Sequence, residues 1–342
     1  MAQYLRECLD SIAAQPFADW ECILGVEESR DATEAIAREY VAKDPRFKMF
    51  TAPRSGSCSA SRNTGIDMAR GEYVLFVDGD DTIAPGSLQR LHDAISSRPG
   101  ADIYPCAMHV ESEVAERQNE YRDNYPKDST GELTGTEAIL QAYSILREPC
   151  PMLQLSVFRR EHLAANNLKC LYGLKRQDSE FFPRAFYLAR RVIPLHEPYY
   201  IYRIRAGSVS MMAMPMRTDY FLESYAGILK SLLAFHAKVS REIGFDNRLS
   251  RFWARHWFTW LYWYWFAPRV IAGTPRKKRR ETLQKIFTDG FADFDAFARH
   301  GTRTRRIAGF FMKLFVRHPS LGWLSDFFFR RIYFPASTRL TR

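Results

Sequence analysis

The sequence lacks the features of a secreted, zinc-binding or membrane-spanning protein. Its six cysteines are scattered without a C-x-x-C pair, so neither a zinc site nor a disulfide framework is indicated, and a reducing, cytosolic setting is favoured. The first residues include Arg6 and Glu7 and no apolar segment of the signal-peptide kind, so we expect no export. No apolar run reaches the roughly 18 residues of a spanning helix; the nearest, residues 252–266, contains Arg255 and His256. We therefore expect no transmembrane helix.

The composition is that of a globular protein with an excess of positive charge. The chain has 342 residues, of which 46% are hydrophobic and 26% charged, enough for one large or two modest cores. The net charge of +10 favours an anionic partner such as nucleic acid, a membrane surface or a phosphorylated small molecule. Paired zinc ligands and RNP-like strands are absent, so we expect no nucleic-acid partner.

Short apolar segments alternate with helical patterns in the first two hundred residues. The pattern predicts strands at residues 20–26, 47–50 and 72–77, with helices from residue 31 and over residues 57–69. This alternation predicts an α/β fold with a doubly wound, mostly parallel sheet. In such sheets ligands bind beyond the carboxyl ends of the strands.

The composition changes near residue 215, where we place a domain boundary. Tryptophans crowd residues 253–265, and basic clusters follow at residues 276–280 and 303–306. We expect residues 216–342 to form a helical, basic and aromatic-rich region. Its apolar helical faces beside basic clusters favour association with an anionic membrane surface. The alternative is a helical subdomain with a solvated basic face.

An acidic cluster, Asp78-Gly79-Asp80-Asp81, follows the apolar segment that ends at Val77. Carboxylates on one tight turn repel each other unless a cation or hydrogen-bond donors compensate. Their hard oxygen ligands suit Mg²⁺ or Mn²⁺, which commonly bridges to substrate phosphates. Short acidic strings are frequent, so the cluster alone also fits a surface turn or a helix cap.

The residues before this cluster carry a more specific pattern. Residues 59–67 read Ser-Ala-Ser-Arg-Asn-Thr-Gly-Ile-Asp, and Gly71-Glu72-Tyr73 precedes the strand. This stretch resembles the family-2 glycosyltransferases of the GT-A type, in which an Ala-Arg-Asn-x-Gly element, Gly-Glu-Tyr and an Asp-x-Asp-Asp strand end occur in the same order. The resemblance implies that Arg62 and Asp78 contact the nucleotide-sugar and that Asp80 also binds the divalent cation that bridges its diphosphate.

Residues 21–31 resemble the family's second strand and the acidic turn after it. Glu27 falls where the family usually holds the nucleotide base, so the resemblance implies the same role for it here. Val26 and Glu28 depart from the family pattern. The identity of the base stays open, with uridine as the default.

Residues 174–182 resemble the family's Glu-Asp-x-x-Phe element, with Gln177 in place of the usual glutamate. The resemblance implies that Asp178 is the base that takes the proton from the acceptor hydroxyl in an inverting transfer. Glu180 is the second candidate. An exposed aspartate in a polar helix turn is the purely structural alternative.

Residues 197–210 resemble the family's closing strand and Gly-Ser-x-Ser loop. Guanidinium and hydroxyl groups suit a diphosphate leaving group, so the binding candidates here are Arg203, Arg205, Ser208 and Ser210. The family often has histidine where Arg205 stands. Whether this cation supplements the metal or changes its coordination stays open.

The resemblance covers residues 1–212 and begins inside the family's first helix. The family's opening strand, which leads into Pro-x-Tyr-Asn, does not precede it, and we expect an upstream start site to supply that strand. The alternative is a shortened fold that exposes strand edges and lacks part of the nucleotide pocket.

The resemblance implies that residues 1–215 form a GT-A-like domain that uses a nucleotide-sugar. The expected reaction is inverting transfer from a nucleoside-diphosphate donor, a UDP-sugar by default, to a cell-envelope glycan or lipid-linked oligosaccharide. The expected location is cytoplasmic, on the inner face of the cell membrane. Val26, Gln177 and the absent strand motivate one rival, a catalytically impaired binding module in a membrane-bound glycan-assembly complex.

Overall fold

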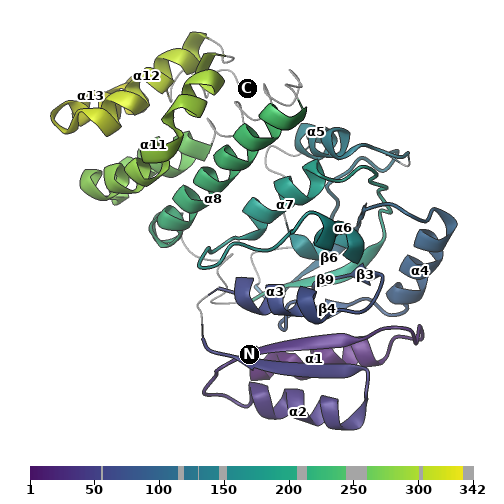
Figure 1. Ribbon diagram of the computed structural model, residues 1–342. Coiled ribbons are helices and arrows are strands. Elements are labelled where there is room, and N and C mark those ends of the chain that lie inside the picture. Colours follow the sequence, from purple (N-terminus) through teal and green to yellow (C-terminus); the bar gives the residue numbers. More distant parts are fainter. Residues whose placement is uncertain are drawn as a thin grey trace. The chain divides into compact units, whose positions relative to one another are not determined.

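The chain forms two compact units, Met1–Met211 and Met212–Arg342 (Figure 1). The computed structural model describes residues 1–54, 57–114, 119–129, 131–145, 152–205, 214–243, 260–299 and 303–333. The roles assigned to the two parts from the sequence stay predictions.

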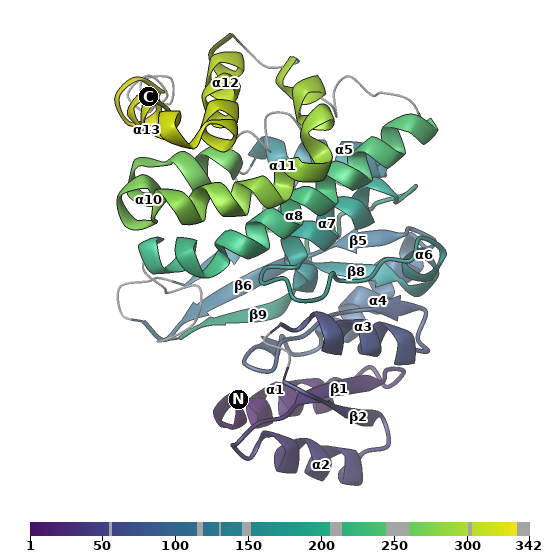
Figure 2. The same cartoon turned by 60° about the vertical axis from the view of Figure 1, so that its left-hand side comes forward.

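The first unit begins with a small α/β layer. Its elements are α1 (Ala2–Ala13), β1 (Cys22–Glu27), α2 (Thr33–Lys43) and β2 (Phe47–Ala52). β1 and β2 pair in parallel, with Cys22 opposite Phe47. α1 buries Leu5, Cys8, Leu9 and Ile12, which recur at helical spacing. The predicted strand–helix–strand rhythm is therefore present here, with α1 and α2 beside the two strands (Figure 2).

Two further sheets complete the first unit. Their strands are β3 (Tyr73–Val74), β4 (Thr82–Ile83), β5 (Ile103–Pro105), β6 (Ala107–Ser112), β7 (Glu120–Arg122), β8 (Ser156–Arg159) and β9 (Pro198–Ile204). The helices around them are α3 (Ser59–Met68), α4 (Ser87–Ser97), α5 (Gly135–Ile145), α6 (Arg160–Ala165) and α7 (Asp178–Tyr187), with a 3₁₀ turn, η1 (Leu153–Leu155). The strand orders are β3-β8-β5 and β4-β9-β6-β7.

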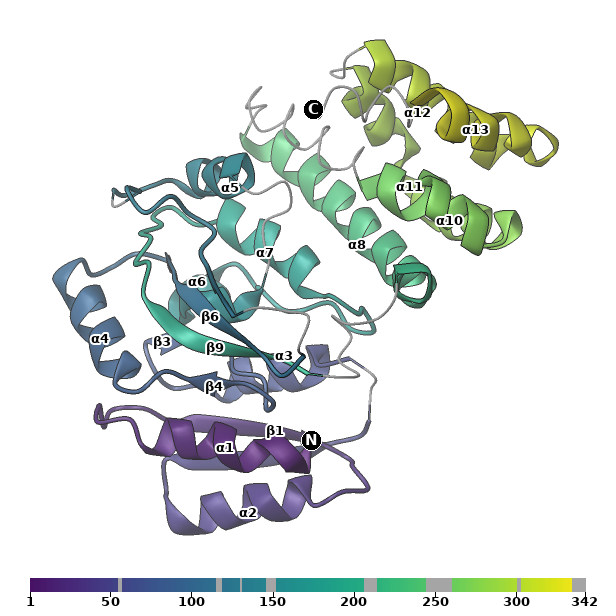
Figure 3. The same cartoon turned by 180° about the vertical axis from the view of Figure 1, so that it is seen from behind.

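The predicted α/β class is confirmed, and the strand pairing is mixed. β6 and β9 run parallel, like β1 and β2, whereas β8 is antiparallel to β3 and β5, and β4 and β7 are antiparallel to their neighbours. The pairing of β4 with β9 matters most, because it places the segment after Val77 against the end of β9 (Figure 3).

The segment predicted as a strand over residues 72–77 pairs only at Tyr73 and Val74. The residues after it are still apolar because they are packed: Phe76 is 8% exposed, and Leu75 and Val77 pack against the main core. The continuous apolar sequence therefore indicates that these residues are buried. It does not show how many of them form hydrogen-bonded strand pairs.

The second unit is helical. Its elements are α8 (Met214–Ile243), a π-helical turn η3 (Tyr262–Phe266), α10 (Pro268–Gly273), α11 (Arg276–Arg299), α12 (Arg303–Arg317), η4 (Pro319–Leu321), α13 (Gly322–Phe328) and a second π-helical turn η5 (Phe329–Tyr333). The indole N–H of buried Trp265 donates to the Thr282 hydroxyl at 2.9 Å. Among the described helices, none is both long and apolar enough to cross a bilayer.

Candidate active site

The acidic cluster forms a tight turn between Phe76 and β4. The backbone N–H of Asp81 donates to the carbonyl of Asp78 at 3.0 Å, which closes the turn. β4 then pairs with β9 through Thr82 opposite Ile201. This antiparallel register brings the turn beside Arg203 and Arg205 at the end of β9, although more than a hundred residues separate them in the chain.

Asp81 anchors the turn from inside. It is 1% exposed and accepts hydrogen bonds from the Tyr200 hydroxyl at 2.5 Å and the Arg203 backbone N–H at 2.7 Å. Burial raises the pKa of this carboxyl to about 7, although those two hydrogen bonds oppose the shift. Asp81 is thus a buried support, and Asp78 and Asp80 are the partly exposed carboxylates of the turn.

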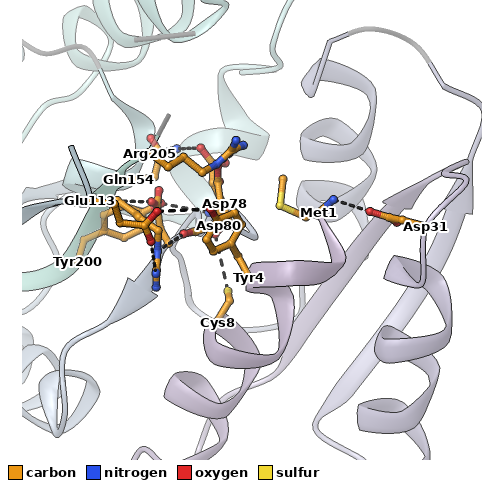
Figure 4. Close-up of polar contacts among 12 residues, drawn as sticks. Met1, Tyr4, Cys8, Asp31, Asp78, Asp80, Glu113, Gln154, Tyr200 and Arg205 are labelled. Carbon is orange, nitrogen blue, oxygen red and sulfur yellow. Dashed lines mark hydrogen bonds and ion pairs between the residues drawn. The ribbon is translucent and has the colours of Figure 1, made fainter. Parts of the chain in front are cut away.

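Asp78 accepts hydrogen bonds at both carboxylate oxygens. Arg62 of α3 donates to Oδ1 at 2.8 Å. Gln154 of η1 donates to Oδ2 at 2.5 Å (Figure 4). The Arg62 side chain is 10% exposed. Burial acts to lower the pKa of Arg62, but the neighbouring Asp78, Cys58 and Asp178 together outweigh burial and raise the pKa. Arg62 and Asp78, each predicted from the resemblance to contact the nucleotide-sugar, lie together as a charged pair.

Asp80 is compensated by Arg205. The guanidinium donates through Nε and Nη2 to Oδ2 of Asp80 at 3.2 and 3.0 Å. The Tyr4 ring lies beneath this cation, with its centroid 5.3 Å from the guanidinium carbon of Arg205 (Figure 4). Arginine at this position therefore supplies part of the positive charge that the acidic turn requires.

Arg203 connects several segments of the first unit. It forms ion pairs with Glu7 of α1 at 2.5 Å and with Glu113, just after β6, at 2.9 Å. Its Nε donates to the carbonyl of Asp80 at 3.1 Å. Arg203 thus holds α1 and the end of β6 against the acidic turn, in addition to any contact it makes with a ligand.

Asp178, the predicted base, is the first residue of α7. The backbone N–H of Ser179 donates to its Oδ1 at 2.9 Å. Burial raises the pKa of Asp178, whereas the charges of Arg176 and Arg62 act to lower it. Because Arg62 acts on both carboxylates, Asp178 and Asp78 share one electrostatic neighbourhood. Arg176 has a φ of 60°, a left-handed conformation uncommon for residues other than glycine.

Glu180, the second candidate, is fully buried at 0% exposure. Both of its carboxylate oxygens accept from Arg184, at 2.5 and 2.6 Å, and Arg184 also donates to the carbonyl of Lys169. Glu180 therefore holds Arg184, which joins α7 to the segment before it. This arrangement favours Asp178 over Glu180 as the base.

The start of α3 positions the segment that leads into Asp178. The Asn63 amide exchanges two hydrogen bonds with the backbone of Cys170, at 2.8 and 2.7 Å. The Ser57 hydroxyl donates to the carbonyl of Leu174 at 2.8 Å. Gln177, which replaces the family's glutamate, donates to the Cys58 sulfur at 2.7 Å. α3 therefore contributes both Arg62 and the support for Asp178.

The remaining predicted site residues are Glu27, Ser208 and Ser210. Glu27 is the last residue of β1 and is partly buried. Ser208 and Ser210 lie outside the described residues. Within the described ranges, no three His, Cys, Asp or Glu side chains converge as a ready-made metal site.

Sequence reasoning missed Gln154 as a site residue. An amide in a three-residue 3₁₀ turn has no periodic signal, and no motif quoted above includes it. Asn63 belongs to the most specific sequence motif, but only the fold shows that its side chain supports the segment at Cys170. Tyr4 and Glu113 reach the site only through the packing of α1 and the end of β6.

The α/β unit and its acidic turn define a glycosyltransferase-like domain of the GT-A type. Residues 2–163 match the sequence model of the family described as glycosyl transferase family 2. The segment that spans residues 2–163 therefore carries a glycosyltransferase family 2 domain.

Curated relatives and solved structures agree with this assignment. EpsJ of Bacillus subtilis, named as an uncharacterized glycosyltransferase, is 29% identical over 64% of this chain and 63% of its own length. GgaB of the same organism, named as a minor teichoic acid biosynthesis protein, is 33% identical over 26% of this chain and 10% of its own length. Staphylococcus aureus TarS 1–349, solved with UDP-GlcNAc, matches with a TM-score of 0.52 at 22% identity, over 88% of this chain and 89% of that one.

The match spans only part of the relatives. It covers 63% of EpsJ and 58% of EpsH, another Bacillus subtilis protein, so about three fifths of each protein aligns with this chain. The likeness to TarS shows the fold.

Proposed function

We propose that the protein is an inverting glycosyltransferase with Asp178 as its base. The observation that carries the proposal is the position of Asp178, a partly buried carboxylate with a raised pKa in the field of the Arg62–Asp78 pair. A base of this kind is expected where perturbed carboxylates meet a charged binding group. Family membership supports glycosyl transfer as the reaction.

The donor is proposed to be a nucleoside-diphosphate sugar, with a UDP-sugar as the default. Arg62, Arg205 and Arg203 place guanidinium groups around the acidic turn, where they suit the charge of a diphosphate. Glu27 is proposed to hold the base of the nucleotide. Ser208 and Ser210 are proposed to contribute hydroxyls to the diphosphate.

The residues of the turn fit a divalent cation, Mn²⁺ or Mg²⁺. Asp80 has one carboxylate oxygen on Arg205, and Asp80 is partly exposed. A cation that takes one or two carboxylates and completes its shell with phosphate oxygens needs no protein cage. Such a cation would neutralise the charge of the diphosphate leaving group, with Asp80 as its protein ligand.

In the proposed reaction, Asp178 accepts the proton of the acceptor hydroxyl as that oxygen attacks the anomeric carbon. Attack from the face opposite the diphosphate inverts the configuration at that carbon. The hydrogen bond from Ser179 fixes the carboxylate, and the base contributes about 10²–10⁴-fold to the rate. Arg205 stabilises the departing diphosphate electrostatically.

The acceptor is proposed to be a cell-envelope glycan or a lipid-linked oligosaccharide. The name of GgaB, which refers to teichoic acid biosynthesis, supports the surface-glycan class. A lipid-linked acceptor would place the enzyme on the cytoplasmic face of the membrane, and the second unit is proposed to hold it there. Nucleic acid is not a proposed partner.

The test is the substitution Asp178→Asn. We expect transfer to a glycan acceptor to fall by about 10²-fold or more, while calorimetric binding of UDP with Mn²⁺ stays near that of the natural chain. Glu161→Gln, which changes an exposed carboxylate on α6, is the matched control and should leave both unchanged. Unchanged turnover in Asp178→Asn would remove the base assignment. A well-folded natural chain that binds none of several nucleoside diphosphates would favour the impaired binding module.

A further inference from the structure

The outer helices of the second unit expose large apolar side chains. Within the described part of that unit, the large hydrophobic residues that are exposed all lie between residues 307 and 332, and they are Ile307, Phe310, Leu321, Trp323, Phe327 and Ile332. Phe310, Trp323 and Phe327 are more than half exposed, at 60%, 53% and 54%. Apolar side chains gathered in one short segment indicate a surface that meets a partner.

These exposed side chains are not needed by the helical core. α12 and α13 pack through Phe311 and Phe328, whose rings stack with centroids 4.1 Å apart. Ala308, Met312 and Phe315 fill the inner face of α12. Each helix therefore has a second apolar set beside the one that it buries, whereas a helix with one buried face has polar residues opposite it.

The exposed face of α12 has an apolar edge and a basic edge. At 100° per residue, Ile307, Phe310 and Leu314 fall on one side of the outer arc, and Arg306, Lys313 and Arg317 fall on the other. Residues 303–333 contain seven Lys or Arg and a single acidic residue, Asp326. This combination of apolar and basic edges is typical of a helix in the membrane interface.

Asp326 does not offset the positive charge of residues 303–333, because its carboxylate pairs with Arg276 and Arg279 elsewhere in the unit. Arg279, whose side chain is 1% exposed, donates to both Asp326 oxygens at 2.9 and 3.0 Å, and Arg276 forms a second ion pair with it at 3.1 Å. The charge presented by this segment is therefore basic.

A cavity of about 530 Å³ lies beside this surface. The charged residues that line it are Arg276, Arg279, Arg330 and Asp326, and exposed Phe327 also lines it. Arg276 and Arg279 pair with Asp326, and Arg330 adds a third guanidinium to the lining, so the cavity has excess positive charge. Burial lowers the pKa of Arg279, and repulsion from Arg276 and Arg330 acts in the same direction. A bound anion would relieve this repulsion.

We propose that α12, α13 and η5 form a docking surface for an anionic phospholipid bilayer, and that the arginine-lined cavity receives a lipid phosphate. The aromatic side chains enter the boundary between head groups and acyl chains, and the basic edge of α12 contacts anionic head groups. The excess of basic over acidic side chains along this segment favours an anionic lipid surface over a protein partner. The proposal rests on the proposed function in one respect, namely that this surface brings the enzyme to a lipid-linked acceptor.

The experiment is vesicle flotation with the full-length chain. We expect binding to phosphatidylcholine vesicles that contain phosphatidylglycerol, much weaker binding to phosphatidylcholine alone, and release at high salt. The double variant Phe310→Ser/Phe327→Ser and the single variant Arg330→Glu should each weaken partitioning, by about tenfold or more for the double variant. All are surface changes, and circular dichroism establishes that the variants fold.

Matched controls come from the first unit. Tyr172→Ser removes a side chain that is 72% exposed, and Lys127→Glu reverses an exposed charge. Both should leave vesicle binding unchanged. Asp178→Asn should also float normally, so loss of catalysis and loss of membrane binding are separate results.

Three outcomes would overturn the proposal. The first is failure of the natural chain to bind anionic vesicles. The second is a Phe310→Ser/Phe327→Ser variant that floats normally but dissociates an oligomer in sedimentation, which would make this surface an interface between copies. The third is an Arg330→Glu variant that loses affinity for inorganic phosphate and keeps full vesicle binding, which would assign the cavity to a soluble anion.

Discussion

At the residue scale, Asp178 combines a demand of chemistry with a cost in stability. A base must be poised to accept a proton, and the raised pKa that burial gives this carboxyl suits the role proposed for it. The folded state therefore holds a proton on Asp178 at pH values where the unfolded chain has released it. Stability falls as the pH rises through the folded-state pKa, and the full penalty is present above it.

We therefore expect Asp178→Asn to stabilise the protein while it lowers transfer by about 10²-fold or more. The melting temperature of the variant should exceed that of the natural chain at about pH 8. The difference should shrink as the pH falls and vanish near the unfolded pKa of aspartate, about 3.9. Thermal unfolding across this pH range measures it, with the exposed Glu161→Gln as control. A difference that persists unchanged at low pH would exclude ionisation of Asp178 as its cause.

At the element scale, α3 and α7 build the site between them. α3 carries Arg62, and its Asn63 holds the chain at Cys170, from which it continues to α7 and Asp178. α7 is held in turn by α5, since the backbone N–H of Gly135 donates to the carbonyl of Ala189, just after α7, at 3.1 Å. The close approach at Gly135 leaves no room for a side chain.

Gly135→Ala should destabilise the first unit. A Cβ at this position would overlap the carbonyl oxygen of Phe186 and lie 2.7 Å from that of Ala189, both backbone atoms. Separating α5 from α7 should cost about 1–3 kcal/mol of unfolding free energy, measured by urea denaturation. Gly131→Ala is the matched control, because nothing lies within 4 Å of the added Cβ there. Equal stability of the two variants would contradict the close packing.

Much of this arrangement could be predicted from local sequence, and part of it could not. Arg62 and Asp78 were both expected to contact the nucleotide-sugar because both lie in the stretch that resembles the family. The proximity of Arg205 to Asp80 depends on the antiparallel register of β4 and β9, which a two-residue strand does not reveal. Gln154 and Glu113 enter through long-range packing and had no pattern of their own. Glu180 is buried, unlike Asp178 two positions earlier, and its ion pair with Arg184 compensates the buried charge.

At the scale of the whole molecule, the chain is divided between two compact units with different composition. The proposed donor site lies entirely in the first unit, and the proposed lipid surface lies entirely in the second. Each unit has its own buried residues, with Tyr104 and Phe158 in the first and Trp265 and Phe329 in the second. A ligand of either site should therefore shift the unfolding transition of the unit that binds it and leave the transition of the other unit unchanged.

Scanning calorimetry should resolve this division. We expect UDP with Mn²⁺ to shift only the transition of the first unit, by about 2.7 kcal/mol at a ligand concentration of 100 times Kd. Gly135→Ala should lower the same transition and so identify it. Arg330→Glu, in the second unit, should leave the nucleotide-induced shift unchanged. A single transition that moves as a whole would show that the two units unfold together.

The contacts of Arg203 have a consequence for genetics. This side chain joins Glu7, Glu113 and the backbone of Asp80, so replacing it removes a support of the first unit as well as any phosphate contact. A random-mutagenesis screen scored on glycan production would rank Arg203 with Asp178, although the two losses have different origins. Scoring the same library for protein abundance would separate them, because Arg203 variants would be depleted from the cell and Asp178 variants would accumulate in an inactive form.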